Sequence, residues 1–321
     1  MTKNFFTETK PVRNLISKLV ERDFGMVKNE KLKDILLKRQ SSSSFIKGVT
    51  SYYLHKGLGG KFSHKEILEL AAGIEIYSTS MVLIDNLIDG HSERDGETTY
   101  LIEYGPEMHG LASVYATNLG LIRLAPYLKD FFDITGLIGS EAIEKAVTSA
   151  VSMDVEKPSD PNEIFENIIR VNGITLGFPL GLVASTASKD KKVIFDIIKY
   201  GVDTGTAFGL YEEIRDFFGE HGRKKASELK GGRTPYFIAD LSTRNPLFDA
   251  TKYIGKEINN EEYILLKKLL KEENAFERTK ILITTHLNYG SNMLKQNLRE
   301  EEFLILNNLR ETIEESLDRL I

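Results

Sequence analysis

The chain has 321 residues, of which 41% are hydrophobic, so it contains enough apolar material for one large core. Its formal net charge is -5 and acidic and basic residues are interspersed, which argues against a nucleic-acid partner because such a protein needs a basic surplus on one face. Cysteine is absent, and this excludes disulfides, thiolate metal sites and cysteine nucleophiles.

The sequence predicts a single domain over residues 1–321. No Pro/Gly/Ser-rich linker divides it, and no internal repeat is evident. The first residues lack the apolar core of a signal peptide, and we judge no apolar run long enough to cross a bilayer. We therefore expect no integral membrane segment and a cytoplasmic location.

Apolar residues recur at three- and four-residue spacing through most of the chain, as in amphipathic helices. Residues 63–66, SHKE, have the capping-box pattern and precede a stripe of Ile67, Leu70, Ile74 and Tyr77. A long helix is predicted from there to about residue 89. Asp160-Pro161 predicts a second helix start, and residues 298–321 a final helix. Because strand patterns of period two are lacking, the predicted fold class is all-α.

The first pattern with chemical meaning is residues 84–89, IDNLID. Asp85 and Asp89 are four residues apart, so on a helix their carboxylates lie on one face, one turn apart. Two such anions repel each other by roughly a few tenths of a kcal/mol, and Mg²⁺, which prefers oxygen ligands, would relieve the repulsion. The alternative is an ordinary solvated helix end, which is commoner for an isolated DxxxD.

A second acidic pattern occupies residues 211–220, YEEIRDFFGE. Glu212, Asp216 and Glu220 share one face if the helix continues through Gly219, although a charged surface helix is the alternative. Two acidic clusters facing one another across a helical bundle could hold several Mg²⁺ ions around a diphosphate, with an apolar cavity for a hydrocarbon tail.

Four segments resemble, in order and spacing, the motifs of the trans-prenyl diphosphate synthases, or polyprenyl synthetase family. Residues 85–89 resemble the first DDxxD motif, with Asn86 at its second position, and residues 94–99, RDGETT, resemble its RRGxPT stretch. Residues 212–216, EEIRD, stand where the second DDxxD is expected, and residues 231–235, GGRTP, resemble GKxTxP. The resemblance covers about residues 40–240.

This resemblance implies an all-α isoprenoid-synthase bundle around a deep central apolar cavity, normally a homodimer, that binds an allylic prenyl diphosphate with three Mg²⁺ ions. The implied metal ligands are Asp85, Asp89, Glu212, Asp216 and Glu220. The implied catalytic residues are Asp85, Asp89 and Arg94. The chain-length pocket would include Tyr77, Ser80 and Met81, where small or flexible residues leave room for a tail of about C15–C20 unless they only pack the core.

On the side that binds the allylic diphosphate, the family pattern is partly altered. Its KT pair corresponds to Asn172-Gly173, and the Lys of GKxTxP corresponds to Gly232. The remaining diphosphate-binding candidates are Arg94, Arg170, Lys230 and Arg233. These charges could still bind, and help to ionise, a prenyl diphosphate.

The largest departures concern the site for the acceptor, isopentenyl diphosphate. The family's basic GKxxRP turn corresponds to residues 43–48, SSFIKG, where Lys47 is the one basic remnant. Ser78 replaces a His, and Asp95 replaces the second Arg of RRG. A carboxylate desolvated against a diphosphate would cost several kcal/mol, so we interpret the acceptor site as dismantled.

Three functions fit this pattern. The first, which we favour from sequence, is a terpene-synthase-like enzyme that ionises its substrate without elongation; the spacing of the second cluster also resembles the NSE triad of such enzymes. The second is an ordinary polyprenyl (geranylgeranyl-type) diphosphate synthase, or a prenyltransferase with another acceptor. The third is a non-catalytic subunit in a heterodimer with an active synthase.

Overall fold

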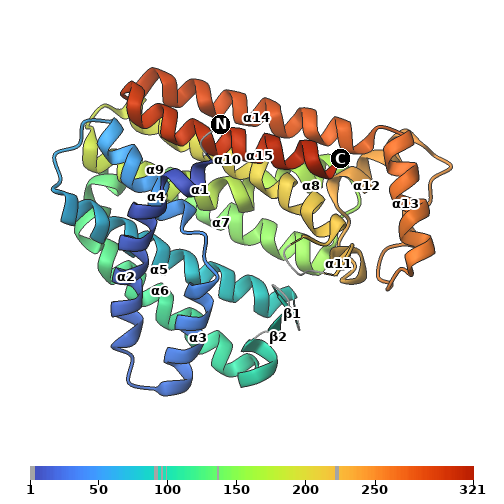
Figure 1. The fold of residues 1–321 in the computed structure, drawn as a ribbon, viewed down its shortest axis with the longest axis horizontal. Coiled ribbons are helices and arrows are strands. Elements are labelled where there is room, and N and C mark those ends of the chain that lie inside the picture. The colour runs from blue at the N-terminus through green and yellow to red at the C-terminus, as the bar shows by residue number, and fades with distance from the viewer. Residues whose placement is uncertain (1–3, 90–92, 95–96, 99, 136, 221–223) are drawn as a thin grey trace. The chain divides into compact units, whose positions relative to one another are not determined.

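A computed structural model describes residues 4–321 except residues 90–92, 95–96, 99, 136 and 221–223. The described residues form helices joined by short turns (Figure 1). One small ladder accompanies them, in which β1 (Glu93–Arg94) pairs antiparallel with β2 (Glu97–Thr98), Glu93 opposite Thr98. The all-α prediction is confirmed.

The described helices include those predicted to start at residues 63–66 and at residues 160–161, and the predicted final helix over residues 298–321. In chain order they are α1 (Phe5–Glu8), α2 (Lys10–Gly25), α3 (Glu30–Ser41), α4 (Ile46–Gly57), α5 (His64–Asp89), α6 (Tyr100–Thr135), α7 (Leu137–Val151), α8 (Pro161–Ile168), α9 (Ile174–Ala187), α10 (Lys191–Phe218), α11 (Ser227–Lys230), α12 (Tyr236–Arg244), α13 (Asn260–Glu272), α14 (Ala275–Asn297) and α15 (Glu300–Leu320). Two π-helical turns, η1 (Ser152–Glu156) and η2 (Ile169–Gly173), and a 3₁₀ turn, η4 (Ala250–Lys252), complete them.

The chain forms two compact units, each assembled from separate stretches of sequence. Unit 1 contains residues 1–137, 178–198 and 293–309, and unit 2 contains residues 138–177, 199–292 and 310–321. Helices α9, α10, α14 and α15 contribute residues to both units. The single isoprenoid-synthase domain predicted over residues 1–321 stays a prediction.

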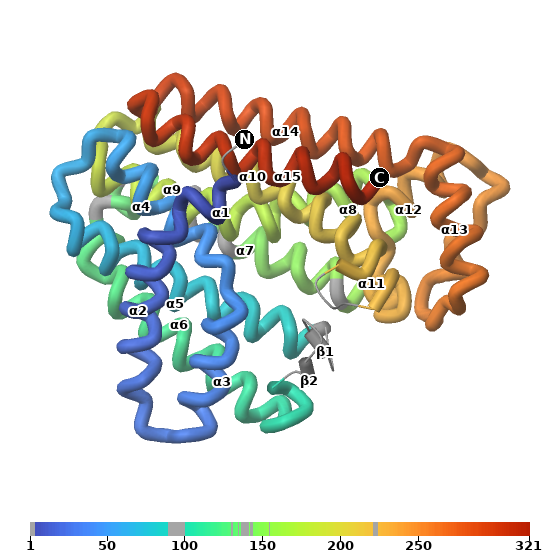
Figure 2. The backbone as a smooth tube through the Cα atoms, viewed as in Figure 1, coloured from blue at the N-terminus to red at the C-terminus, as the bar shows by residue number. Residues whose placement is uncertain are grey.

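Helix α5 is the buried centre of unit 1, and α6 runs beside it (Figure 2). The predicted capping box is present, since the Ser63 amide donates to Glu66 Oε2 at 2.7 Å. The two helices approach closely because Gly120 of α6 has no side chain. A Cβ at Gly120 would lie 2.8 Å from the backbone of Tyr77. This contact fixes the helix that carries the first carboxylate cluster.

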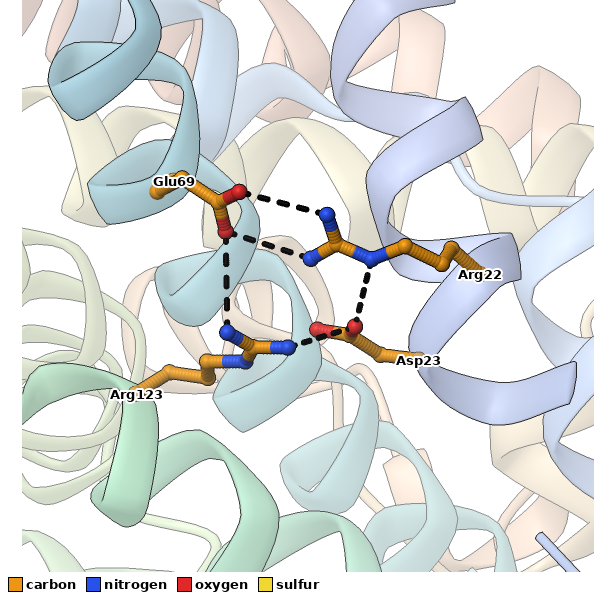
Figure 3. A network of polar contacts seen from close by, with 4 residues as sticks. All are labelled: Arg22, Asp23, Glu69 and Arg123. Carbon is orange, nitrogen blue, oxygen red and sulfur yellow. Dashed lines mark hydrogen bonds and ion pairs between the residues drawn. The ribbon is translucent and has the colours of Figure 1, made fainter. Parts of the chain in front are cut away.

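A network of two arginines and two acids ties α2, α5 and α6 together (Figure 3). Asp23 of α2 has a side chain only 1% exposed, and it accepts from Arg123 Nη2 at 2.6 Å and from Arg22 Nε at 3.0 Å. Glu69 of α5 pairs with Arg22 at 3.2 Å and with Arg123 at 3.7 Å. A buried carboxylate needs such partners, so the network holds α5 in register with its neighbours.

In unit 2 the start of α8 matches the predicted signal, because Asp160 Oδ1 accepts from the amide of Asn162 at 2.8 Å. The π-helical turn η2 then packs closely on α10. A Cβ at Gly205 would overlap the carbonyl oxygen of Asn172, and one at Gly209 would lie 2.8 Å from the Asn172 side chain. Because these two positions of α10 lack side chains, η2 can pack against α10 at Gly209, less than one helical turn before Glu212 of the second acidic cluster.

An aromatic cluster holds the end of α10. The ring of Phe217, 1% exposed, lies 5.5 Å from those of Phe237 and Phe276 and 5.2 Å from that of Tyr263. Rings at these separations pack favourably, so the last turn of α10 is fixed by the core of unit 2.

Our prediction that no apolar run could cross a bilayer is wrong as to length and composition. Among the described residues, 64–88 and 161–187 are long and apolar enough. In the structure, 72% and 50% of their most apolar windows are buried within the protein. Burial of this kind is typical of core helices. Helix α5 in particular packs against other helices of unit 1.

Candidate functional site

The first carboxylate cluster stands at the end of α5. Asp85 is exposed there, whereas Asn86 is 3% exposed and faces the packed side of the helix. An Asn at this position of the motif therefore leaves the exposed carboxylate unchanged. Asp89 is the last residue of α5, and Arg94 lies in β1 with its Cα opposite that of Glu97. The side chains of Asp89 and Arg94, and all of Asp95, lie outside the described residues.

Lys47, which we predicted to be the remnant of a basic acceptor turn, lies beside a buried acid. The Gly48 amide donates to Glu75 Oε1 at 2.5 Å, at the start of α4. Burial raises the pKa of Glu75 and lowers the pKa of half-buried Lys47, and the two charges partly offset these shifts. Ser78, which replaces the family's His, is buried. Lys47, the basic residue of this turn, therefore already lies near the carboxylate of Glu75.

The three residues predicted for the chain-length pocket all lie on α5. Ser80 is fully buried and its Oγ donates to the Tyr77 carbonyl at 2.6 Å, while its own carbonyl accepts from Ser113 Oγ of α6 at 3.0 Å. Tyr77 and Met81 are half-buried. The contacts of Ser80 are those of a helix–helix interface, and the pocket role of all three residues stays a prediction.

The second acidic cluster is shaped by the end of α10. This helix stops at Phe218, and Gly219 has a φ of +72°, a conformation that suits glycine and ends helices. The condition under which Glu212, Asp216 and Glu220 would share one helical face is therefore not met. Instead Arg215 contacts acids on both sides of the turn at Gly219. It pairs with Glu212, and its Nε lies 3.4 Å from Glu220 Oε2.

Two acids of this motif anchor the segment that follows it. Asp216, 3% exposed, accepts from Ser227 Oγ at 2.6 Å and from the Glu228 amide at 3.0 Å. Glu213, 5% exposed, accepts from the Tyr236 amide at 2.8 Å. Burial, followed by the charge of Glu228, raises the pKa of Glu213 to about 8. Sequence reasoning missed Glu213, although its place in the motif beside Glu212 could have indicated it.

The basic candidates of unit 2 have acidic neighbours. Arg170 pairs with Glu166 at 2.8 Å, Lys230 with Glu257 at 3.0 Å, and Arg233 lies 4.0 Å from Glu228. These pairs are partly or largely exposed, so they hold the side chains only weakly.

Sequence reasoning also missed Lys157, which comes from a distant segment to the position where the family's Lys is absent. Its Nζ donates to the Gly231 carbonyl at 2.7 Å. A Cβ at Gly232 would lie 3.0 Å from that Nζ, and the φ of Gly232 is +85°. Gly232 thus both adopts a conformation suited to glycine and leaves space for an ammonium group.

The fit of these residues to Mg²⁺ differs between the clusters. Asp85 offers an exposed carboxylate, which is the donor chemistry that Mg²⁺ prefers. In the second cluster the acids are engaged with Arg215, Ser227 and a backbone amide. Across the part of the chain that the structure describes, no three acidic or histidine side chains are placed to hold one ion. The five metal ligands named from sequence stay a prediction.

Comparisons with known proteins support the resemblance. No family model matches the chain. The "short chain isoprenyl diphosphate synthase" of Methanocaldococcus jannaschii is 24% identical over 180 residues, which are 54% of this chain and 55% of that protein. The match therefore spans about half the length of the curated relative. The predicted sequence resemblance to the trans-prenyl diphosphate synthases is confirmed over this stretch.

Solved structures match almost the whole chain. The geranylgeranyl pyrophosphate synthetase of Pyrococcus horikoshii has a TM-score of 0.84 at 14% identity, covering 97% of this chain and 98% of its own. The heptaprenyl diphosphate synthase of Staphylococcus aureus has a TM-score of 0.80 at 17% identity, covering 98% and 99%. The geranylgeranyl pyrophosphate synthase of Corynebacterium glutamicum, complexed with isoprenyl diphosphate and magnesium, has 0.80 at 16%, covering 95% and 98%. The all-α isoprenoid-synthase fold is thereby confirmed.

Proposed function

We propose that this chain, which has the fold of the trans-prenyl diphosphate synthases, is a Mg²⁺-dependent enzyme acting on an allylic prenyl diphosphate. The observation that carries the proposal is the exposed Asp85 carboxylate at the end of the buried helix α5, in a fold shared with synthases of this class. Asp85 and Asp89 are four residues apart on α5, so a cation would relieve the repulsion between their charges. We further propose a cytoplasmic enzyme.

The reaction we propose is prenyl transfer of the polyprenyl diphosphate synthase type, with an allylic substrate of about C15–C20. Two observations favour it over the terpene-synthase-like reaction that we favoured from sequence. The curated relative and the solved structures named above are all synthases. In addition, α10 ends at Phe218, so Glu212, Asp216 and Glu220 do not form a triad along one helix.

In this proposal Mg²⁺, when bound, would supply positive charge that offsets the charge of the diphosphate leaving group. Asp85 and Asp89 would hold the ion. Basic side chains would bind the diphosphate oxygens and stabilise the charge that develops on them, the candidates being Arg94, Lys157, Arg170, Lys230 and Arg233. Lys157 would supply the ammonium group that Gly232 lacks, since its Nζ already lies beside that residue.

Ionisation without elongation is the second candidate, and the acceptor region favours it. Lys47 lies near the buried Glu75, and Ser78 is a buried hydroxyl where the family has an imidazole. A basic remnant that already has an acidic neighbour binds a second diphosphate weakly. The two candidates therefore predict different products from the same allylic substrate.

Metal and diphosphate binding are tested by thermal unfolding. We expect Mg²⁺ and a non-ionisable bisphosphonate together to raise the Tm more than the sum of their separate effects, because each ligand offsets the charge of the other. Asp85→Lys should abolish the joint increase. Asp133→Lys, at an exposed aspartate of α6, is the matched control and should keep it. An undiminished joint increase in Asp85→Lys would show that this cluster is not the metal site.

The reaction is tested by product analysis. Geranyl, farnesyl and geranylgeranyl diphosphates are each incubated with the protein and Mg²⁺, with and without isopentenyl diphosphate. Prenyl transfer of the synthase type predicts longer diphosphates that form only when the acceptor is present. Hydrocarbon or alcohol formed equally well without the acceptor would instead establish the second candidate. Absence of any turnover, combined with intact ligand binding, would leave the non-catalytic subunit as the better explanation.

A further inference from the structure

The guanidinium of Arg215 occupies the second acidic cluster. Arg215 lies three residues after Glu212 on α10 and pairs with it. Beyond the end of the helix, Glu220 returns so that its Oε2 lies 3.4 Å from Arg215 Nε. One cation thus contacts carboxylates on both sides of the positive-φ turn at Gly219.

Besides the two acids, an aromatic ring contacts the Arg215 guanidinium and helps to hold its position. Its guanidinium carbon lies 5.2 Å from the centre of the Tyr211 ring, within the range of a cation–π contact. That ring is itself fixed, because Tyr211 Oη and Ser316 Oγ lie 2.7 Å apart in a buried hydrogen bond. The Arg215 side chain is 16% exposed, so its interactions with the acids are screened less than those of a surface pair.

The charge balance of the cluster follows from these contacts. Glu212, Asp216 and Glu220 bring three negative charges, and Arg215, which contacts Glu212 and Glu220, cancels one of them. A divalent ion entering between the two acids would meet a fixed positive charge at short range, which opposes binding. The remaining acid of the predicted metal set, Asp216, is already hydrogen-bonded to Ser227 and to the Glu228 amide.

We propose that Arg215 acts as an internal cation that closes the second acidic cluster, so that in the free protein this cluster binds no divalent ion until the guanidinium is displaced. The inference deepens the proposed function and rests on it for the identity of the ion. Carboxylates and a diphosphate compete for a guanidinium in the same bidentate manner. A diphosphate is therefore the kind of anion that draws Arg215 away and opens the cluster.

The test measures Mn²⁺ binding from the free-ion electron paramagnetic resonance signal, without turnover. All proteins carry Asp85→Asn, which removes the exposed carboxylate of the first cluster. With Arg215 intact, adding Glu212→Gln should leave Mn²⁺ binding unchanged. Adding Arg215→Gln to the Asp85→Asn protein should create a site whose Mn²⁺ affinity is at least about tenfold higher than that of the Asp85→Asn protein itself, because a positive charge next to the ion is lost. Combining Glu212→Gln with Arg215→Gln should abolish this new site. Arg215→Lys, which keeps the positive charge, should not create it.

Two results would overturn the proposal. One is Mn²⁺ binding by the Asp85→Asn protein that Glu212→Gln removes while Arg215 is present. The other is a folded Arg215→Gln protein, verified by circular dichroism, that gains no site. The first comparison does not depend on the folding of any Arg215 variant. Because no step requires catalysis, the proposal can fail while the proposed reaction stands, and the reverse also holds.

Discussion

At the scale of single residues, His55 is a buried imidazole with both nitrogens in use. Its Nε2 accepts from the Phe62 amide at 3.3 Å, so the proton of the neutral ring is assigned to Nδ1, which lies 3.0 Å from Thr186 Oγ1. The ring also stacks on Phe62, with centroids 4.7 Å apart. Protonation of Nε2 would set two N–H groups against each other, and burial lowers the pKa of His55.

This geometry predicts a loss of stability in acid. The folded-state pKa of His55 is below its usual value near 6.5, so as pH falls the unfolded chain takes up the proton first. The free energy of unfolding should therefore fall below about pH 6.5, by up to about 1.4 kcal/mol per pH unit for this group. Urea unfolding at pH 7.5, 6.5 and 5.5 measures the slope, which should be shallower in His55→Gln than in wild type. His64→Gln, at an exposed histidine, is the control. Equal slopes for wild type and His55→Gln would refute the assignment.

Which residues the sequence could reveal depends on where their partners lie. Asp85 and Asp89 are visible because their meaning is contained in a four-residue spacing. Lys157 and Glu213 were missed because their partners, Gly231 and Tyr236, are brought to them by folding from distant positions. The pairing of Arg215 was missed for a different reason. Its contact with Glu220 depends on the turn at Gly219, whereas the sequence was interpreted under the condition that the helix continues through that residue.

At the scale of elements, local signals were enough for helix starts. The caps at Ser63 and Asp160 predict α5 and α8 because a cap involves only neighbouring residues. The end of α10 was also signalled, since glycine is the usual residue just beyond a helix. The π-helical turn η2 was not predictable, because it depends on a close approach to Gly205 and Gly209 of another helix.

This close approach predicts which glycine can be replaced. In Gly205→Ala the new methyl group would overlap the Asn172 carbonyl, a backbone atom that cannot rotate away, so we expect a loss of roughly 1–3 kcal/mol in unfolding free energy. The matched control is Gly25→Ala at the end of α2, where a Cβ would have no atom within 4 Å. Alanine there should be neutral or slightly stabilising. Guanidinium-induced unfolding of the two variants measures the difference, and equal stabilities would contradict the described packing of η2.

At the scale of the whole molecule, the all-α class follows from hydrophobic periodicity, and the isoprenoid-synthase fold from the order of four short motifs. Neither signal carries information about association, because an exposed and a buried apolar residue look the same in a periodic pattern. The homodimer expected from the family resemblance therefore depends on surfaces that only the structure identifies. A heterodimer with a synthase is the alternative.

Helix α6 carries such a surface on the side away from α5. Its exposed apolar residues at one helical face are Leu111, Val114, Leu121 and Ile122. Val114, Leu121 and Ile122 follow Leu111 by 3, 10 and 11 residues, which places the four side chains within about 100° of one another around the helix axis. Apolar side chains gathered in this way commonly mark association sites, and a symmetric dimer would pair the face with itself.

We therefore expect a homodimer in solution that depends on this face of α6. Light scattering coupled to gel filtration should give twice the chain mass of 36.3 kDa for the wild-type protein at micromolar concentration. The double variant Leu111→Lys, Ile122→Lys should be monomeric, because it would bring four like charges into an interface that had buried apolar side chains. Leu247→Lys, at an exposed leucine outside α6, should remain a dimer. A monomeric wild type, or a double variant that stays dimeric while folded, would exclude α6 as the interface and leave the heterodimer to be tested by adding an active synthase.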